Sequence, residues 1–230
     1  MEQGYVGSLN DKGKPHGKGL CIRANGDKYK GDFDDGEPHG EGIYCFADGN
    51  SYYGEWAKGT YDGEGYFSFT DGSWYEGEWK DGLRNGKGEA NYADGSRYQG
   101  EFLNGESHGK GVLISPDGSS YDGDFSNGKR HGEGVLIFTD GERYEGCFIN
   151  GAHHGRGKFT FANRNCFEGD FVGGKMSAGH LYLAHVDRRL PAVFSGGDGI
   201  VNGRRLYHLV LTNDDGSAYK EGGFRNGKFV

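Results

Sequence analysis

Aromatic rings and glycines recur at a step of 23 residues along most of this chain. In each copy, a first ring is followed two residues later by a glycine and four residues later by a second ring. The first rings are Tyr29, Tyr52, Tyr75, Tyr98, Tyr121, Tyr144 and Phe167, and the second rings are Phe33, Trp56, Trp79, Phe102, Phe125, Phe148 and Phe171. The glycines between them are Gly31, Gly54, Gly77, Gly100, Gly123, Gly146 and Gly169. Such a period predicts a repeat array rather than a globule.

Each copy has the pattern of a β-hairpin. In residues 29–51, two short runs of alternating polar and apolar residues are separated by turn residues. Because strand side chains alternate between faces, Tyr29, Gly31 and Phe33 share one face. The glycines on that face leave room for rings, much as an aromatic side chain covers a bare strand glycine.

Turn pairs separate the runs. Asn-Gly and Asp-Gly pairs suit left-handed backbone positions, and they include Asn85-Gly86, Asn104-Gly105, Asn127-Gly128, Asn150-Gly151 and Asp48-Gly49. No segment shows a helical period with start and stop caps. The sequence therefore predicts an all-β fold, an elongated, twisted, single-layer antiparallel sheet of tandem 23-residue hairpins.

The repeat resembles a known family. Tyr121–Gly134 follows the pattern Y-x-G-x-F/W-x-x-G-x-x-H-G-x-G and is similar to the MORN repeat, and the likeness extends over residues 5 to about 175. This resemblance implies an antiparallel sheet of hairpins that forms a groove. It also implies scaffolding roles, often at flagella, basal bodies and other cytoskeletal or membrane-contact structures. Two finer resemblances point to a motile cilium. Residues 5–19 resemble the opening repeat of a ciliary radial-spoke MORN subunit, and residues 176–199 resemble the tail of a sperm- and cilium-associated MORN protein.

The pattern weakens toward the C-terminus, where Ala178 and His180 stand at positions expected to hold glycine. We therefore expect an array of seven to eight repeats over residues 1–175, and degenerate repeats over 176–230 that continue the same sheet. An open sheet must protect its last strand, so residues 176–230 are interpreted as a cap. The alternative is that they form a docking end for a partner.

Composition narrows the function. The net charge is −8, and no cluster of Lys and Arg suits a nucleic acid or an anionic membrane. No 18-residue apolar stretch or signal-peptide pattern occurs, which favours a cytoplasmic protein. The four cysteines form no C-x-x-C pair and are interpreted as reduced, partly buried residues.

Two polar columns are candidates for chemistry. Copies of the repeat are expected about 10 Å apart, so histidines of neighbouring copies cannot share a metal ion, and a turn hydrogen-bonding role is favoured. These histidines are His16, His39, His108, His131 and His154. The acidic column lies on the face opposite the rings and comprises Asp32, Glu55, Glu78, Glu101, Asp124 and Asp170, with Cys147 intervening. It is interpreted as a solvated face bridged to lysines, with docking of a basic partner segment as the alternative.

No phosphate loop, serine elbow or cysteine–histidine pair is recognisable. We therefore expect no catalytic residue, cofactor or metal, and a non-enzymatic scaffold whose partners are other protein subunits of a cytoskeletal assembly. The favoured setting is the axoneme of a cilium or flagellum. The predicted partner groove is lined by Tyr29, Phe33, Tyr52, Trp56, Tyr75, Trp79, Tyr98, Phe102, Tyr121, Phe125, Tyr144 and Phe148. The alternative function is a membrane-contact or phosphoinositide-binding adaptor, which the negative charge disfavours. A regulatory array of an enzyme would require a larger C-terminal domain.

Overall fold

The computed structural model describes residues 2–184, 188–201, 204–212, 218–225 and 228–229. It divides the chain into two compact units, Met1–Pro116 and Asp117–Val230. The described residues contain strands, turns and loops and no helix, which confirms the all-β prediction.

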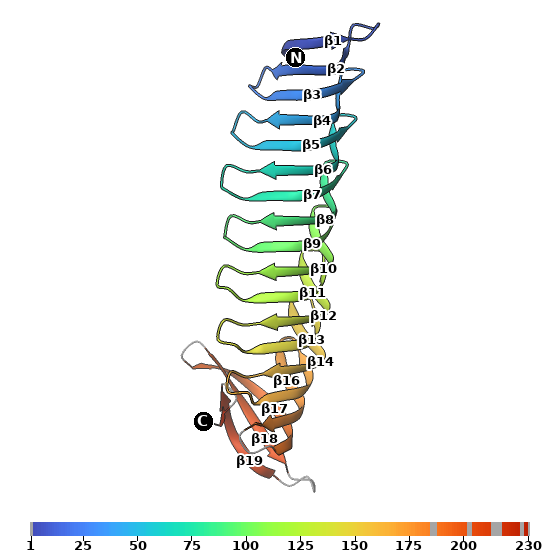
Figure 1. The fold of residues 1–230 in the computed structure, drawn as a ribbon. Coiled ribbons are helices and arrows are strands. Elements are labelled where there is room, and N and C mark those ends of the chain that lie inside the picture. The colour runs from blue at the N-terminus through green and yellow to red at the C-terminus, as the bar shows by residue number, and fades with distance from the viewer. Residues whose placement is uncertain (1, 185–187, 202–203, 213–217, 226–227, 230) are drawn as a thin grey trace. The chain divides into compact units, whose positions relative to one another are not determined.

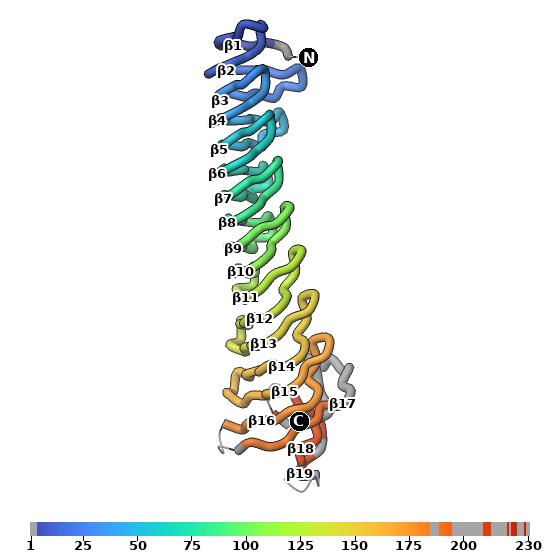
Figure 2. Tube along the Cα trace, turned by 90° about the vertical axis from the view of Figure 1, so that its right-hand side faces the viewer, coloured from blue at the N-terminus to red at the C-terminus, as the bar shows by residue number. Residues whose placement is uncertain are grey.

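Unit 1 is an antiparallel sheet in which strands follow one another in chain order (Figure 1). Its strands are β1 (Glu2–Leu9), β2 (Pro15–Arg23), β3 (Lys28–Asp34), β4 (Glu37–Cys45), β5 (Ser51–Ala57), β6 (Thr60–Ser68), β7 (Trp74–Lys80), β8 (Leu83–Asn91), β9 (Arg97–Leu103) and β10 (Glu106–Ile114). Figure 2 shows the hairpin ends of successive repeats stacked in file along this unit.

Unit 2 continues the same pattern in its first six strands. Its strands are β11 (Ser120–Ser126), β12 (Lys129–Ile137), β13 (Arg143–Ile149), β14 (Ala152–Thr160), β15 (Cys166–Val172), β16 (Lys175–Leu183), β17 (Arg188–Val201), β18 (Arg204–Thr212), β19 (Ala218–Arg225) and β20 (Lys228–Phe229). Each pairs antiparallel with the next in sequence. The pairing of β15 with β16 and of β16 with β17 runs across the expected boundary at residue 175.

A row of glycines crosses each sheet, and the first ring of each repeat covers it. Gly54 lies opposite Gly42 on one side and Gly65 on the other. A Cβ atom at Gly54 would lie 2.5 Å from the Cα of Gly65 and 2.6 Å from the Tyr52 hydroxyl oxygen. Tyr52 donates a hydrogen bond from that hydroxyl to the carbonyl of Glu55 at 2.9 Å. Because the ring lies flat on the backbone, only glycine fits beneath it.

The first and second rings form the core. Tyr52 meets Trp56 of its own repeat edge to face, with ring centres 5.3 Å apart, and Trp79 of the next repeat at 5.5 Å. The same alternation occurs in unit 2, where Tyr144 contacts Phe148 and Phe171. Such pairs each contribute roughly 0.5 to 1.5 kcal/mol beyond the area that they bury. Successive repeats therefore share one continuous aromatic core within each unit.

The turns differ from the predicted ones in detail. Asn104-Gly105 has two left-handed residues, as predicted, with φ of 51° and 88°. Asn85-Gly86 is not a turn, because it lies within β8, where Gly86 belongs to an irregular register between β7 and β8. The two-residue turn of that repeat is Asp81-Gly82 instead. Within this repeat, Asn85-Gly86 therefore lies at a bulge in the strand, and Asp81-Gly82 forms the hairpin tip.

Both loop edges link one repeat to the next. At the two-residue turns, Gly59 donates its backbone N–H to the carbonyl of Pro38 at 3.0 Å. At the longer loops, Asp27 accepts the backbone N–H of Ala47 at 2.9 Å, and Asn165 accepts that of Ala184 at 3.0 Å. These bonds satisfy loop backbone groups that the sheet leaves free.

The C-terminal strands close the core of unit 2. Phe194 on β17 contacts Phe167 with ring centres 5.0 Å apart. Phe224 on β19 contacts Phe161 at 5.4 Å and is fully buried, as are Leu209 and Leu211. The C-terminal segment therefore covers rings that a further repeat would otherwise have covered.

Candidate partner-binding groove

The twelve rings predicted to line a partner groove are buried in the structure. Their exposed fractions run from 0% to 8%, the largest being that of Trp79. Each first ring folds over its glycines and packs between two second rings, so little of its surface meets solvent. These residues are core residues as well as repeat markers, and a partner would meet the side chains that cover them.

The covering side chains come from one position of the repeat that sequence reasoning missed. This position directly follows the first residue of the strand after each two-residue turn and lies opposite the second ring. It is occupied by Pro38, Tyr61, Arg84, Ser107, Arg130, His153 and Met176. Its signal in the sequence is variability midway between two glycines that recur in all but the last copy, such as Gly59 and Gly63 around Tyr61. This variability gives each repeat a different surface.

Two covering residues stack flat on core tyrosines. Tyr61 lies on Tyr52 with ring centres 3.9 Å apart and an interplanar angle of 22°. His153 lies on Tyr144 at 3.7 Å and 14°. Burial raises the pKa of Tyr61 to about 12, so its hydroxyl is neutral at physiological pH.

Two others place a cation over the rings. The Arg84 guanidinium lies 5.6 Å from the centre of Tyr75 and 5.2 Å from that of Phe102, and it donates to the carbonyl of Gly105 at 2.5 Å. Arg130 repeats this arrangement in unit 2, where it donates to Gly151 O at 3.0 Å. Burial lowers the pKa of the Arg130 guanidinium from its usual value. Both arginines therefore combine cation–π contact with a turn hydrogen bond.

A groove of about 540 Å³ opens above this layer in unit 2. Its floor is apolar and consists of Leu136, Phe138, Phe159, Phe161, Phe171 and Met176. Phe138 is partly exposed, whereas the other five are at most 9% exposed and belong to the core beneath the groove. Arg130 and His153 lie at the edge formed by the two-residue turns, whereas Asp140 and Glu142 belong to the longer loop at the other end of β12. The groove thus has an apolar base, a basic edge and an acidic edge, a combination suited to a polypeptide segment.

The acidic column has a structural role that the sequence pattern did not reveal. Glu78 accepts the backbone N–H of Lys87 at 2.8 Å, and Asp124 accepts that of Glu133 at 3.0 Å. The column therefore satisfies backbone donors at the bulges. Bridging to basic residues, as predicted, occurs between Lys18 and Asp32 at 3.0 Å.

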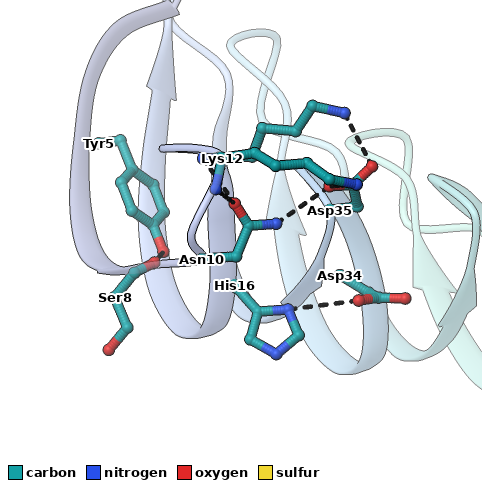
Figure 3. A network of polar contacts seen from close by, with 8 residues as sticks. Tyr5, Ser8, Asn10, Lys12, His16, Asp34 and Asp35 are labelled. Carbon is teal, nitrogen blue, oxygen red and sulfur yellow. Dashed lines mark hydrogen bonds and ion pairs between the residues drawn. The ribbon is translucent and has the colours of Figure 1, made fainter.

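The predicted turn hydrogen-bonding role of the histidines is not seen at His39, His108 and His131, which lie within β4, β10 and β12. The carbonyls of His39, His108 and His131 accept hydrogen bonds from core tyrosine hydroxyls at 3.2 to 3.4 Å. His16 instead directs its imidazole Nδ1 toward Asp34 at 3.3 Å (Figure 3). Among the residues that the structure describes, no three His, Cys, Asp or Glu side chains are grouped to hold a metal ion.

The first turn is tied to the second repeat by its own polar network (Figure 3). The Asn10 side-chain amide donates to Asp35 at 3.0 Å, and the Lys14 ammonium lies 2.8 Å from the same carboxylate. The hydrogen bonds from Lys14 and Asn10 lower the pKa of Asp35. The first copy has Leu9 in place of a second ring, and its turn is held to the second repeat by these contacts with Asp35.

Comparison with known proteins shows the family. The MORN repeat model matches seven consecutive segments, 11–28, 29–51, 52–74, 75–97, 98–120, 121–143 and 144–166, which is more than half of the chain. The chain belongs to the MORN-repeat family, whose all-β repeats are typical of structural and protein-interaction proteins. A comparison with curated proteins gives no significant match.

Two solved structures are distant likenesses of this chain. The TCP domain of Drosophila melanogaster SAS-4, in complex with a proline-rich motif of Ana2, is 12% identical with a TM-score of 0.41, over 65% of this chain and 81% of that one. A virginiamycin B lyase from Staphylococcus aureus is 10% identical with a TM-score of 0.17, over 96% of this chain and 73% of that one.

Proposed function

We propose that this protein is a non-enzymatic scaffold that holds a segment of a partner protein in the unit-2 groove. The observation that carries the proposal is the groove itself, in which the partly exposed Phe138 lies on an apolar floor between edges of opposite charge. A floor of aromatic side chains provides anchoring surface, and the two edges orient the segment. The setting we propose is a cytoskeletal assembly, the axoneme of a cilium or flagellum with radial-spoke-type partners. The ciliary resemblances of residues 5–19 and 176–199 support that setting.

The family and the net charge of −8 also favour protein partners over nucleic acid or anionic membrane. No helix that could span a membrane occurs in the part of the chain that the structure describes. The C-terminal cap lies in the same unit as the groove, so docking through residues 176–230 would be an extension of the same interface.

The test is localisation of a tagged copy in a flagellated cell, followed by crosslinking to identify neighbours. We expect the tagged chain in the axonemal fraction and a crosslinked partner segment at the groove. Phe138→Ser should remove that crosslink, because Phe138 lies on the groove floor. Phe69→Ser, at the equivalent position of a unit-1 repeat, is the matched control and should retain it. Recovery only in the soluble extract would refute the axonemal setting, and an unchanged crosslink in Phe138→Ser would refute the groove.

A further inference from the structure

The outer face of unit 1 carries an exposed apolar patch over β4–β7, on the side away from the aromatic core. Ile43 lies directly opposite Tyr53, and Tyr53 directly opposite Tyr66, so the three side chains form a line across the strands. Their exposed fractions are 42%, 56% and 37%. Trp74 packs beside Tyr66 with ring centres 6.0 Å apart. We call Ile43, Tyr53, Tyr66 and Trp74 the outer patch.

A row of glutamates runs beside the outer patch on the same four strands. Glu41 and Glu55 lie directly opposite each other, as do Glu64 and Glu78. All four side chains are exposed, and none forms an ion pair with a residue that the structure describes. Like charges directly opposite in a sheet are destabilising, so the two opposed pairs are unfavourable in the isolated chain even though Glu78 also accepts the backbone N–H of Lys87. We call these four residues the glutamate row.

The uncompensated charge ends where the outer patch ends. On the preceding strands, Lys18 pairs with Asp32 at 3.0 Å. On the following strands, Arg97 pairs with Glu89 at 2.6 Å, and Lys87 lies opposite Glu101. Opposed glutamates without an ion pair and exposed tyrosines therefore occur together on β4–β7.

We propose that this face docks a basic amphipathic helix of a partner protein, a role separate from the unit-2 groove. Neighbouring strands lie about 4.8 Å apart, close to the roughly 5.4 Å pitch of an α-helix. An extended chain presents residues on one side only about every 6.7 Å, which fits the row less well. A helix lying across the strands would place one cation near each glutamate and its neighbouring apolar stripe on the outer patch. The four glutamates span roughly 14 Å, or about ten helical residues.

The aromatic rings strengthen the choice of a cationic partner. Arginine and lysine side chains are attracted to the faces of tyrosine and tryptophan, so the outer patch accepts both the apolar and the charged part of such a helix. The glutamate row provides complementary charge, which increases the association rate and orients the helix.

The test uses a synthetic 14-residue helical peptide with arginines at positions 1, 5, 8 and 12 and leucines on the neighbouring stripe. Trp74 is a direct reporter, because the other two tryptophans, Trp56 and Trp79, are only 5% and 8% exposed. We expect the peptide to shift tryptophan emission and to protect Trp74 from acrylamide quenching, with an affinity that falls as salt is added. Both signals should disappear in Trp74→Phe.

Replacing all four residues of the glutamate row with glutamine should weaken binding at least tenfold and flatten its salt dependence. Glutamine keeps the acceptor that Glu78 offers to the Lys87 N–H, so the fold is retained, and circular dichroism checks this. The matched control removes four exposed acids elsewhere through Glu37→Gln, Glu106→Gln, Asp122→Asn and Glu168→Gln, and should bind as the parent does. Tyr53→Ser with Tyr66→Ser should weaken binding while keeping its salt dependence.

Three outcomes would overturn the proposal. Equal loss of binding in the glutamate-row variant and in the control variant would show that net charge alone attracts the peptide. Equal binding of a peptide with glutamine in place of arginine would show an apolar docking face without charge preference. Self-association of the protein that Tyr53→Ser and Tyr66→Ser abolish would make a second copy of this chain the occupant.

Discussion

The outer faces of the two units have the same backbone and different surfaces. Ninety-two residues, four steps of the repeat, separate matched positions on β4–β7 and β12–β15. Where unit 1 has Tyr53 and Tyr66, unit 2 has Glu145 and Lys158. Where unit 1 opposes Glu64 to Glu78, unit 2 pairs Arg156 with Asp170 at 3.3 Å. The comparison shows that the repeated rings and glycines specify the sheet, while the positions between them are free to specify partners.

The largest expected difference between the units is in their stability toward unfolding at alkaline pH. Burial raises the pKa of Tyr29, Tyr52, Tyr75 and Tyr98 in unit 1 well above the usual value. The folded state therefore favours the neutral phenol, and its stability is complete below pH 10 and is lost as the pH rises toward the folded-state pKa. Each tyrosine contributes a loss of roughly 1.4 kcal/mol per pH unit in that window.

Unit 2 has fewer such residues, because Phe167 replaces the third tyrosine of its column. Tyr121, whose pKa burial raises to about 12, and Tyr144 are its titrating core rings. We expect unit 1 to open at a lower pH than unit 2. Mass-spectrometric detection of thiol labelling at buried Cys21 in unit 1 and at Cys166 in unit 2 measures the order. Simultaneous labelling of both would contradict the prediction.

Alanine at a glycine beneath a ring should destabilise both units alike. Gly54 and Gly123 are matched positions three steps of the repeat apart, and a Cβ atom would lie 2.5 Å from a neighbouring Cα at each. Overpacking of this kind costs about 3 kcal/mol. Urea denaturation measures the loss of stability, and hydrogen exchange of peptides from each unit shows which unit is affected. Gly4→Ala, where nothing lies within 4 Å, is the control and should have little effect.

Removing a covering ring should have a smaller effect that differs between units. Tyr61→Ala and His153→Ala expose Tyr52 and Tyr144 respectively, since each ring stacks flat on its tyrosine. The free energy of unfolding should fall by about 0.5 to 1.5 kcal/mol. The loss for Tyr61→Ala should lie at the upper end, because the tyrosine ring is larger. The same urea denaturation measures both variants, and a larger loss for His153→Ala would contradict the assignment.

The smallest expected effect on stability comes from removing one charge on the outer face, and it should have opposite signs in the two units. Glu64→Gln removes repulsion with Glu78 and should stabilise unit 1 by roughly 0.2 to 1 kcal/mol. Asp170→Asn breaks the exposed pair with Arg156 and should slightly destabilise unit 2. Adding salt should reduce both differences, because both arise from exposed charges. Equal signs in low salt would show that the outer faces are electrostatically alike.

Much of the fold was predictable because its determinants are local. The step of the repeat, the hairpins and turns such as Asn104-Gly105 depend on residues close together in the chain. Asn85-Gly86 was misread, since only strand pairing shows that Gly86 belongs to a bulge. The covering position of Tyr61, Arg84 and Arg130 was missed, because contact with a ring 9 residues away depends on the register of two strands.

The amino-acid sequence alone determined that this chain is a β-repeat array of the MORN type, because alternation and turn chemistry act over a few residues. Tertiary structure decided which side of each strand is core and which is surface. Once Tyr52 folds onto Gly54 and packs between Trp56 and Trp79, the predicted groove rings are buried. The surfaces open to partners are then the unit-2 groove above the rings and the outer patch behind them. Both depend on the register between neighbouring strands and on the folding of the rings onto the glycines, which the pattern within one strand does not contain.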